Sequence, residues 1–206
     1  MSTDIRLRYS RATATPRPAG SRQLVGYSPK LECRVALYSR HAFEQWLLLE
    51  SDPSVVAFCE RPVVLTTAQG AKLADFWVHR ETREEFLVLG KGSHTDSVAI
   101  ADATIAVCRV PPTELAAART WISNWEHMLP VINASMGGVR TSLEQDILRF
   151  LGSPRPLMQI ERRYAIGNPS VVRACVFGLL REGHIVAPQL HSEVLSMTTS
   201  FAIAPQ

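Results

Sequence analysis

The sequence predicts an α/β domain with a mixed sheet, followed by a smaller domain built mainly from helices. Short apolar segments typical of strands dominate residues 31–110, and segments with helical spacing lie on either side of them. Beyond Met136-Gly137-Gly138 the pattern changes to short helices. A chain of 206 residues is long enough for one large or two small domains. The expected parts are residues 1–30, 31–136 and 137–206.

Composition excludes several classes of protein. With 46% hydrophobic residues the chain is too apolar to be disordered throughout, and it has no run of about 18 apolar residues that would cross a membrane. No apolar segment follows the first charged residues, so we expect no signal peptide. The four cysteines form no CxxC pair, which argues against a zinc site or a disulfide framework and suits a reducing cytoplasm.

The net charge of +3 hides an uneven distribution. Residues 1–40 carry +6, residues 41–136 carry −5 and residues 137–206 carry +2. Of the 22 basic residues, 19 are arginine, which favours bidentate contacts to phosphate. This asymmetry suggests an anionic partner. A GC-rich genome would also explain the ratio of arginine to lysine.

Residues 1–30 are polar, basic and punctuated by proline and glycine, which predicts an extended basic arm. Alternation predicts a strand over residues 31–37. Ser39 is a suitable N-cap for a helix over 39–50, and Asp52-Pro53 ends it.

The next part of the chain predicts a series of strands and one helix. Gln69-Gly70 is a predicted turn, and residues 98–106 fit either a helix or a strand. Residues 113–129 have the spacing of one amphipathic helix. The predicted strands are 55–58, 63–65, 74–79, 86–89 and 103–110.

The last 70 residues predict three helices and a hairpin. Asn168 can cap the third helix, Pro169 suits its first position and Gly183 ends it. This order of elements is the plan of a winged helix-turn-helix domain. The predicted elements are helices over 142–151, 156–164 and 169–182, and strands over 184–187 and 196–202.

In a helix-turn-helix domain, residues near the start of the recognition helix reach the edges of the bases. Here these are Asn168, Ser170 and Arg173, with Arg162 and Arg163 nearby. Asn and Arg suit adenine and guanine edges. We predict that these five residues bind DNA, and the alternative is a domain that docks on another protein.

Asp75 and Lys91 are the candidate catalytic residues. A carboxylate on an apolar strand is costly without a partner or a metal. Nucleases with a PD-(D/E)xK motif place an Asp and an E/Q-x-K on adjacent strands, where the acids hold Mg²⁺ and the lysine acts on the attacking water. In this chain that segment reads Leu89-Gly90-Lys91, and leucine cannot bind a metal. The alternative for Asp75 is a salt bridge at a strand end.

The segment Leu48–Pro62 carries a more specific pattern. It reads LLESDPSVVAFCERP and resembles the LLExDPxVxxFxExP segment of the TnsA endonuclease family of heteromeric bacterial transposases. Asp75-Phe76 and Lys91 follow where that family has its nuclease motif. The resemblance covers roughly residues 22–92, and the C-terminal part matches in outline.

The resemblance implies a restriction-endonuclease-like domain followed by a winged helix, in a subunit that acts in DNA transposition. Such a subunit nicks the 5′ ends of the transposon with Mg²⁺, and Asp75 and Lys91 take its catalytic positions, with Asp75 as a metal ligand. Its partners would be transposon-end DNA, an integrase-like transposase subunit and an AAA+ ATPase.

The departures from the family define our hypothesis. Tyr38 and Ala42 stand where the family has two glutamates, and Leu89 stands at the second metal ligand. One carboxylate compensates a divalent cation poorly. We therefore expect a subunit that binds DNA and partner proteins while its nuclease site is degenerate. Two alternatives remain: an active enzyme that uses Glu44 as the second acid, and an unrelated winged-helix DNA-binding regulator.

Overall fold

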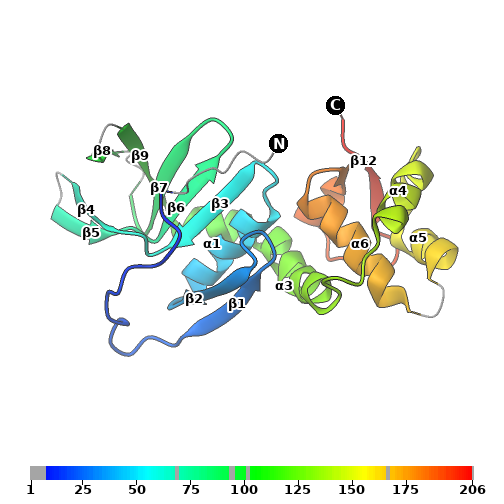
Figure 1. The fold of residues 1–206 in the computed structure, drawn as a ribbon, viewed down its shortest axis with the longest axis horizontal. Helices are drawn as coiled ribbons and strands as arrows, with labels where there is room; N and C mark the ends of the chain where they lie inside the picture. The colour runs from blue at the N-terminus through cyan, green and yellow to red at the C-terminus, as the bar shows by residue number, and fades with distance from the viewer. Residues whose placement is uncertain (1–7, 68–69, 93–95, 101–102, 166–167, 206) are drawn as a thin grey trace. The chain divides into compact units, whose positions relative to one another are not determined.

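The computed structural model describes residues 8–67, 70–92, 96–100, 103–165 and 168–205 (Figure 1). The chain forms two compact units. The first comprises Met1–Leu49 and Ser54–Ala117, and the second comprises Glu50–Pro53 and Ala118–Gln206. The turn at residues 136–138, where the sequence predicts a boundary, lies within the second unit. In the described part of the chain, no helix is both long and apolar enough to span a bilayer.

The first unit is built around a mixed five-stranded sheet with the order β3-β6-β7-β9-β8. Only the β7–β9 pair among these neighbours is parallel, so the predicted α/β class with a mixed sheet is confirmed. The residues left open between helix and strand belong to two antiparallel strands, β8 and β9. The five strands are β3 (Val55–Glu60), β6 (Phe76–Arg80), β7 (Glu84–Leu89), β8 (Asp96–Ile100) and β9 (Ala103–Val110).

Two hairpins complete the strands of this unit, β1 (Leu24–Ser28) with β2 (Cys33–Leu37) and β4 (Val64–Thr67) with β5 (Gly70–Leu73). Strand β1 lies in the segment for which the sequence predicts an extended arm. The pairing with β2 explains the difference, because the partner strand supplies the hydrogen bonds that local sequence does not indicate. Gln69 of the predicted turn lies outside the described residues.

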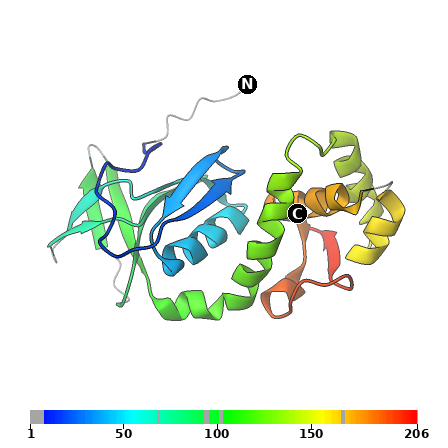
Figure 2. The ribbon, with the colours of Figure 1, turned by 90° about the horizontal axis from the view of Figure 1, so that it is seen from below.

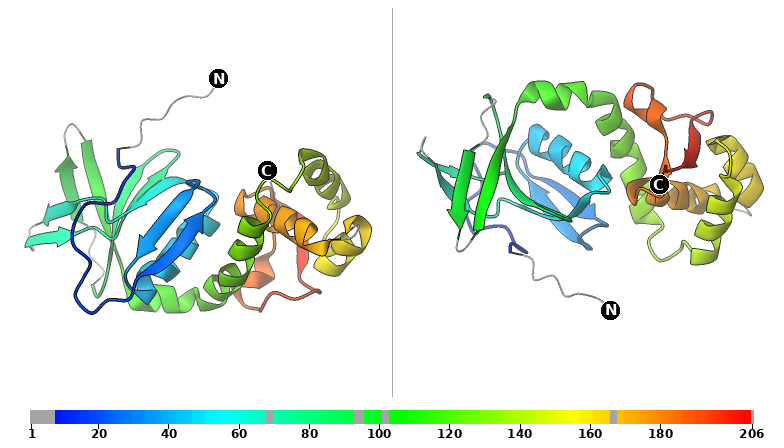
Figure 3. Two further views of the ribbon diagram at one scale, coloured as in Figure 1. Left: turned by 60° about the horizontal axis from the view of Figure 1, so that its bottom comes forward. Right: turned by 90° about the horizontal axis from the view of Figure 1, so that it is seen from above.

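Helix α1 (Arg40–Ser51) begins where the sequence predicts. The Oγ atom of Ser39 accepts a hydrogen bond from the Ala42 N–H at 3.1 Å, as an N-cap does. Its buried Trp46 faces the hairpin, where a Cβ on Gly26 would lie 2.3 Å from the indole ring. Figure 3 shows the hairpin beside α1. The helix is therefore fixed both at its start and along its buried face.

The helix predicted over residues 113–129 is interrupted. It consists of α2 (Pro112–Ala117) and α3 (Arg119–Ala134), with a turn at Ala118. Leu115 is buried in the first unit, while Trp125 and its apolar neighbours are buried in the second. The two apolar faces belong to different units, and this is why one continuous amphipathic pattern yields two helices.

The second unit is mainly helical, as Figure 2 shows. Helix α6 (Pro169–Arg181) is its central element and contacts α3, α4 (Thr141–Phe150) and α5 (Leu157–Tyr164). Asn168 caps α6 by accepting a hydrogen bond from the Ser170 N–H at 2.9 Å, and Gly183 follows the helix with a positive φ of 76°. A small antiparallel sheet joins β10 (Arg155–Pro156), β12 (Ser200–Ile203) and β11 (Ile185–Val186), beside the 3-10 turn η1 (Pro188–His191).

Candidate functional site

Asp75 lies in the bend between β5 and β6. Its backbone is fixed on both sides, since its N–H donates to the Leu87 carbonyl and its carbonyl accepts from the Arg61 N–H, each at 2.9 Å. Its Oδ2 atom accepts a hydrogen bond from the Leu89 N–H at 2.7 Å. Burial raises the pKa of the carboxyl above its usual value, against the opposing effects of this hydrogen bond and of the positive charges of Lys72 and Arg61.

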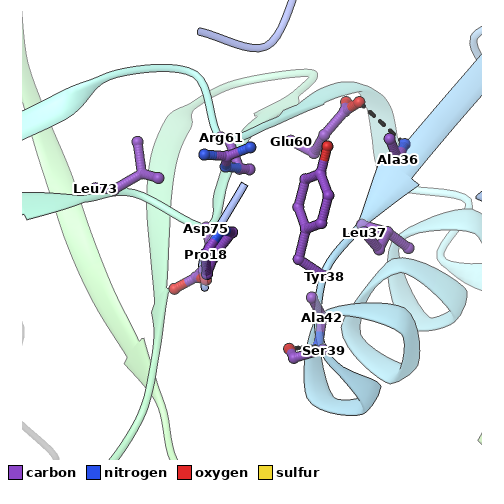
Figure 4. A pocket seen from close by; sticks show the side chains of 10 residues that line it. All are labelled: Pro18, Ala36, Leu37, Tyr38, Ser39, Ala42, Glu60, Arg61, Leu73 and Asp75. Carbon is purple, nitrogen blue, oxygen red and sulfur yellow. Dashed lines mark hydrogen bonds between the residues drawn. The ribbon is translucent and has the colours of Figure 1, made fainter. Parts of the chain in front are cut away.

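A cavity of about 290 Å³ opens beside Asp75 in the first unit (Figure 4). It lies between the start of α1 and the bend that carries Asp75. Charged, polar and apolar groups all contribute to its wall, as is usual for a binding cavity. The lining residues are Pro18, Ala36, Leu37, Tyr38, Ser39, Ala42, Glu60, Arg61, Leu73 and Asp75.

Tyr38 and Ala42 line the same cavity as Asp75. These are the positions at which the resemblance implies glutamates. The structure therefore brings together the three positions at which the nuclease family would have acids. Of these three residues, Asp75 is the one that is an acid. Ala42 is 9% exposed, so its small side chain leaves space in the wall of the cavity.

Glu60 is the second carboxylate in the wall, and the sequence did not indicate it as a site residue. Its Oε1 accepts a hydrogen bond from the Ala36 N–H at 3.3 Å. Burial raises the pKa of the Glu60 carboxyl, while hydrogen bonds from the backbone and the charge of Arg61 act in the opposite direction. In Figure 4 the Glu60 carboxylate is directed towards Ala36 of β2.

Arg61 is the second residue that sequence reasoning missed. Its backbone is left-handed, with φ at 46°, a conformation that costs a residue other than glycine about 1–2 kcal/mol. Its guanidinium carbon lies 4.8 Å from the centre of the Tyr38 ring, within the range of a cation–π contact. Arg61 directly precedes Pro62 within the segment that resembles the transposase family. That position is the sequence signal that could have indicated it.

The other predicted catalytic residues lie away from this cavity. Lys91 is exposed beyond the end of β7 and does not line it. Glu44 does not line it either, and its carboxylate accepts a 2.9 Å hydrogen bond from the Arg40 guanidinium one turn earlier on α1. Lys72 of β5 is the lysine whose charge acts on Asp75.

The described residues contain no group of three or more His, Cys, Asp or Glu side chains arranged to hold a metal ion. Mg²⁺ sites are typically held by one or two protein carboxylates together with substrate phosphates. Asp75 is the residue at the motif position that would contribute such a carboxylate. The donor set here is therefore reduced relative to that of the nuclease motif.

A second candidate site lies in the second unit, beside the start of α6. Here Arg163, Asn168 and Arg140 line a cavity of about 380 Å³. A neighbouring cavity of about 490 Å³ shares Arg163 and adds Arg149. Asp146 lines both cavities and its carboxylate lies 3.2 Å from the Arg149 guanidinium, so the three arginines leave this surface with a net positive charge, as contact with a phosphate backbone requires.

The predicted DNA-binding residues differ in their availability. Arg162 and Arg163 are exposed in the last turn of α5, and Ser170 is exposed in the first turn of α6. Arg173 is bound to Glu161 through two hydrogen bonds, and this pairing raises the pKa of its guanidinium. Arg173 therefore holds α6 against α5 instead of facing solvent freely.

A comparison with models of known protein families finds no match, and none of the curated proteins matches the chain.

Proposed function

We propose that the chain is a TnsA-like subunit that acts in DNA transposition, binds transposon-end DNA and partner transposition proteins, and has a nuclease site that no longer cleaves. It would work in the cytoplasm with an integrase-like transposase subunit and an AAA+ ATPase. Its second unit would take the role of the winged helix, and its first unit that of a restriction-endonuclease-like domain.

The composition of the cavity beside Asp75 carries this proposal. Tyr38 and Ala42 share the cavity with Asp75, which is the arrangement expected if their positions once held metal-binding acids. A tyrosine and an alanine supply no carboxylate, and Leu89 contributes its N–H instead of a ligand. Of the two carboxylates in the wall, Glu60 is bonded to the Ala36 N–H and lies outside the motif positions, so Asp75 is the motif's single acid and the affinity of the site for Mg²⁺ would be low.

The cluster of arginines in the second unit supports a role in DNA binding. Arg140 and Arg163 line the cavity beside the start of α6, whose N-terminal N–H groups favour negative charge, and Arg149 lines the neighbouring cavity. A subunit that binds DNA without cleaving it would serve to assemble the transposition complex on the DNA. The mixture of Arg163 and Asn168 in one wall suits contacts to phosphates and to base edges together.

The experiment is a titration of fluorescent duplexes with the full chain, with and without the two partner proteins. We expect tighter binding to a duplex that carries the transposon end than to one of random sequence, and a steep loss of affinity with salt. Equal and weak binding to both duplexes, with no gain from the partners, would reject the proposal.

A further inference from the structure

The N-terminal arm packs on the first unit at two places, and the first is an aromatic contact. The ring of Tyr9 lies 5.7 Å from that of Trp77 and 5.7 Å from that of Phe86, in edge-to-face arrangements. Beside it, Arg8 donates a hydrogen bond to Glu84 at 2.8 Å. Figure 2 traces the arm from there to the hairpin. Residues 8–23 of the arm, which precede β1, are therefore attached to the domain although they form no helix or strand.

The second place is Arg61. The Thr13 N–H donates to the Arg61 carbonyl at 2.9 Å. In return, Nη2 of Arg61 donates to the carbonyls of Thr15 and Pro16, at 2.8 and 2.9 Å. Two residues further on, Pro18 forms part of the wall of the Asp75 cavity. The arm thus crosses this cavity and is held there by one arginine.

The hydrogen bonds of the Arg61 guanidinium go to two neutral carbonyl oxygens, and its flat face lies over the Tyr38 ring. Its charge also acts on the carboxyls of Asp75 and Glu60. A guanidinium forms shorter and roughly twofold stronger hydrogen bonds with an anionic oxygen than with a neutral one, and its fork matches a phosphate. The left-handed backbone fixes the direction of the side chain at some cost in energy, which is common at functional positions.

We propose that Arg61 binds a phosphate of the DNA backbone, and that the carbonyls of Thr15 and Pro16 occupy its guanidinium in the free protein until DNA displaces them. The inference rests on the proposed function, because it assumes that the chain binds DNA. It adds a phosphate-binding residue in the first unit and gives the arm a role as a competitor for that residue.

Both carboxylates and cations lie near Arg61. Its charge acts on the carboxyls of Asp75 and Glu60, which line the cavity with it and would oppose a phosphate on that side. Lys72 is close enough to act on the charge of Asp75 and adds a second cation on that side. The carbonyls of Thr15 and Pro16 mark the side on which the guanidinium accepts oxygen partners. A phosphate that displaces them would bind the guanidinium on that side.

The first measurement compares Arg61→Gln with Arg83→Gln, which removes the same charge from the exposed turn between β6 and β7. A duplex of about 30 base pairs, roughly three helical turns, serves as the probe. We expect Arg61→Gln to weaken binding on the order of tenfold and to lower the slope of log K against log salt by about 0.9, as the loss of one phosphate contact does. Equal affinities and slopes for the two variants would overturn the inference.

The second measurement needs no substitution. Hydrogen exchange of the arm in the wild-type protein reports on the Thr13 N–H, which is bonded to the Arg61 carbonyl. We expect saturating duplex to speed its exchange, because the arm leaves Arg61. Unchanged or slower exchange would overturn the displacement. If the wild-type chain binds no duplex at all, the proposed function fails as well, whereas binding that is independent of Arg61 rejects this inference alone.

Discussion

The carboxylate of Asp75 accepts a hydrogen bond from the backbone N–H of Leu89 at 2.7 Å. The two residues are 14 positions apart in the sequence and are brought together because β6 pairs with β7. In a PD-(D/E)xK nuclease the residue at the position of Leu89 would offer a second ligand to the metal. Here it offers a single N–H to the carboxylate, so the contact positions Asp75 without supporting a cation.

This contact leads to a prediction for Asp75→Asn. Burial raises the pKa of Asp75 above 3.8, so the folded state holds the proton to a higher pH than the unfolded chain does. The free energy of unfolding therefore falls as the pH rises through the folded-state pKa, and the loss persists at neutral pH. The neutral asparagine removes this loss, and its amide oxygen can still accept from the Leu89 N–H. We expect a higher urea midpoint than for the wild type at neutral pH.

The pH dependence separates this effect from others. As the pH falls below 3.8 the wild-type carboxyl becomes neutral in both states, so the gain from Asp75→Asn should disappear. Asp75→Ala, which removes the acceptor as well, provides the control. A variant that is less stable than the wild type at neutral pH would mean that Arg61 and Lys72 more than compensate the burial of the charge.

Ala42→Glu should create a metal site. Ala42 lines the cavity with Asp75 and lies in the first turn of α1, where a negative side chain is favourable. A carboxylate at this position, beside those of Asp75 and Glu60, would raise the affinity for Mn²⁺ by roughly an order of magnitude or more. Isothermal titration of the metal checks this, with His41→Glu as the matched control because His41 is exposed and does not line the cavity. Equal Mn²⁺ affinities for the two variants would show that position 42 does not face the metal site.

Arg163→Ala and Arg173→Ala should behave differently. Arg163 lines both basic cavities, so its loss should reduce DNA affinity and lower the salt slope by about 0.9. Arg173 is held by Glu161, so its loss should leave DNA affinity nearly unchanged and lower the free energy of unfolding by about 1–2 kcal/mol. Anisotropy titrations and urea unfolding of both variants measure the two effects. If Arg173→Ala weakened DNA binding and Arg163→Ala did not, the DNA-binding surface would include Arg173 and not Arg163.

Gly26→Ala tests the packing of the hairpin on α1. The new methyl group would lie 2.3 Å from the rigid indole of Trp46, an overlap that costs about 1–3 kcal/mol. Gly178→Ala is the control, since nothing lies within 4 Å of its Cβ position and alanine stabilises a helix interior by up to about 1 kcal/mol. Thermal unfolding should show opposite shifts, and a neutral Gly26→Ala would contradict the placement of β1.

The elements that could be predicted from the sequence are those fixed by local chemistry. Ser39 and Asn168 cap their helices with their own side chains, and Gly183 adopts the left-handed backbone that ends α6. Such contacts span two or three residues, so the local sequence contains them. The strands around Asp75 were also predictable, because their apolar residues form short uninterrupted runs.

The features that the sequence did not predict depend on distant partners. Strand β1 has little alternation of its own and is stabilised by β2 and by Trp46. Arg61 is recognised as a site residue only because it donates hydrogen bonds to the carbonyls of Thr15 and Pro16, which lie about 45 positions earlier in the chain. The pairing of Arg173 with Glu161, 12 positions apart, is likewise a contact that the sequence did not predict. Each of these contacts exists only in the folded chain.

We propose that the site at Asp75 does not cleave DNA. The direct measurement incubates the purified chain, the proposed integrase-like and ATPase partners and a plasmid that carries the proposed transposon ends with Mg²⁺ or Mn²⁺, and maps nicks at the 5′ ends. We expect no 5′ nicking above that of the partners alone, and no change with Asp75→Ala. Metal-dependent 5′ nicking that Asp75→Ala abolishes would contradict it.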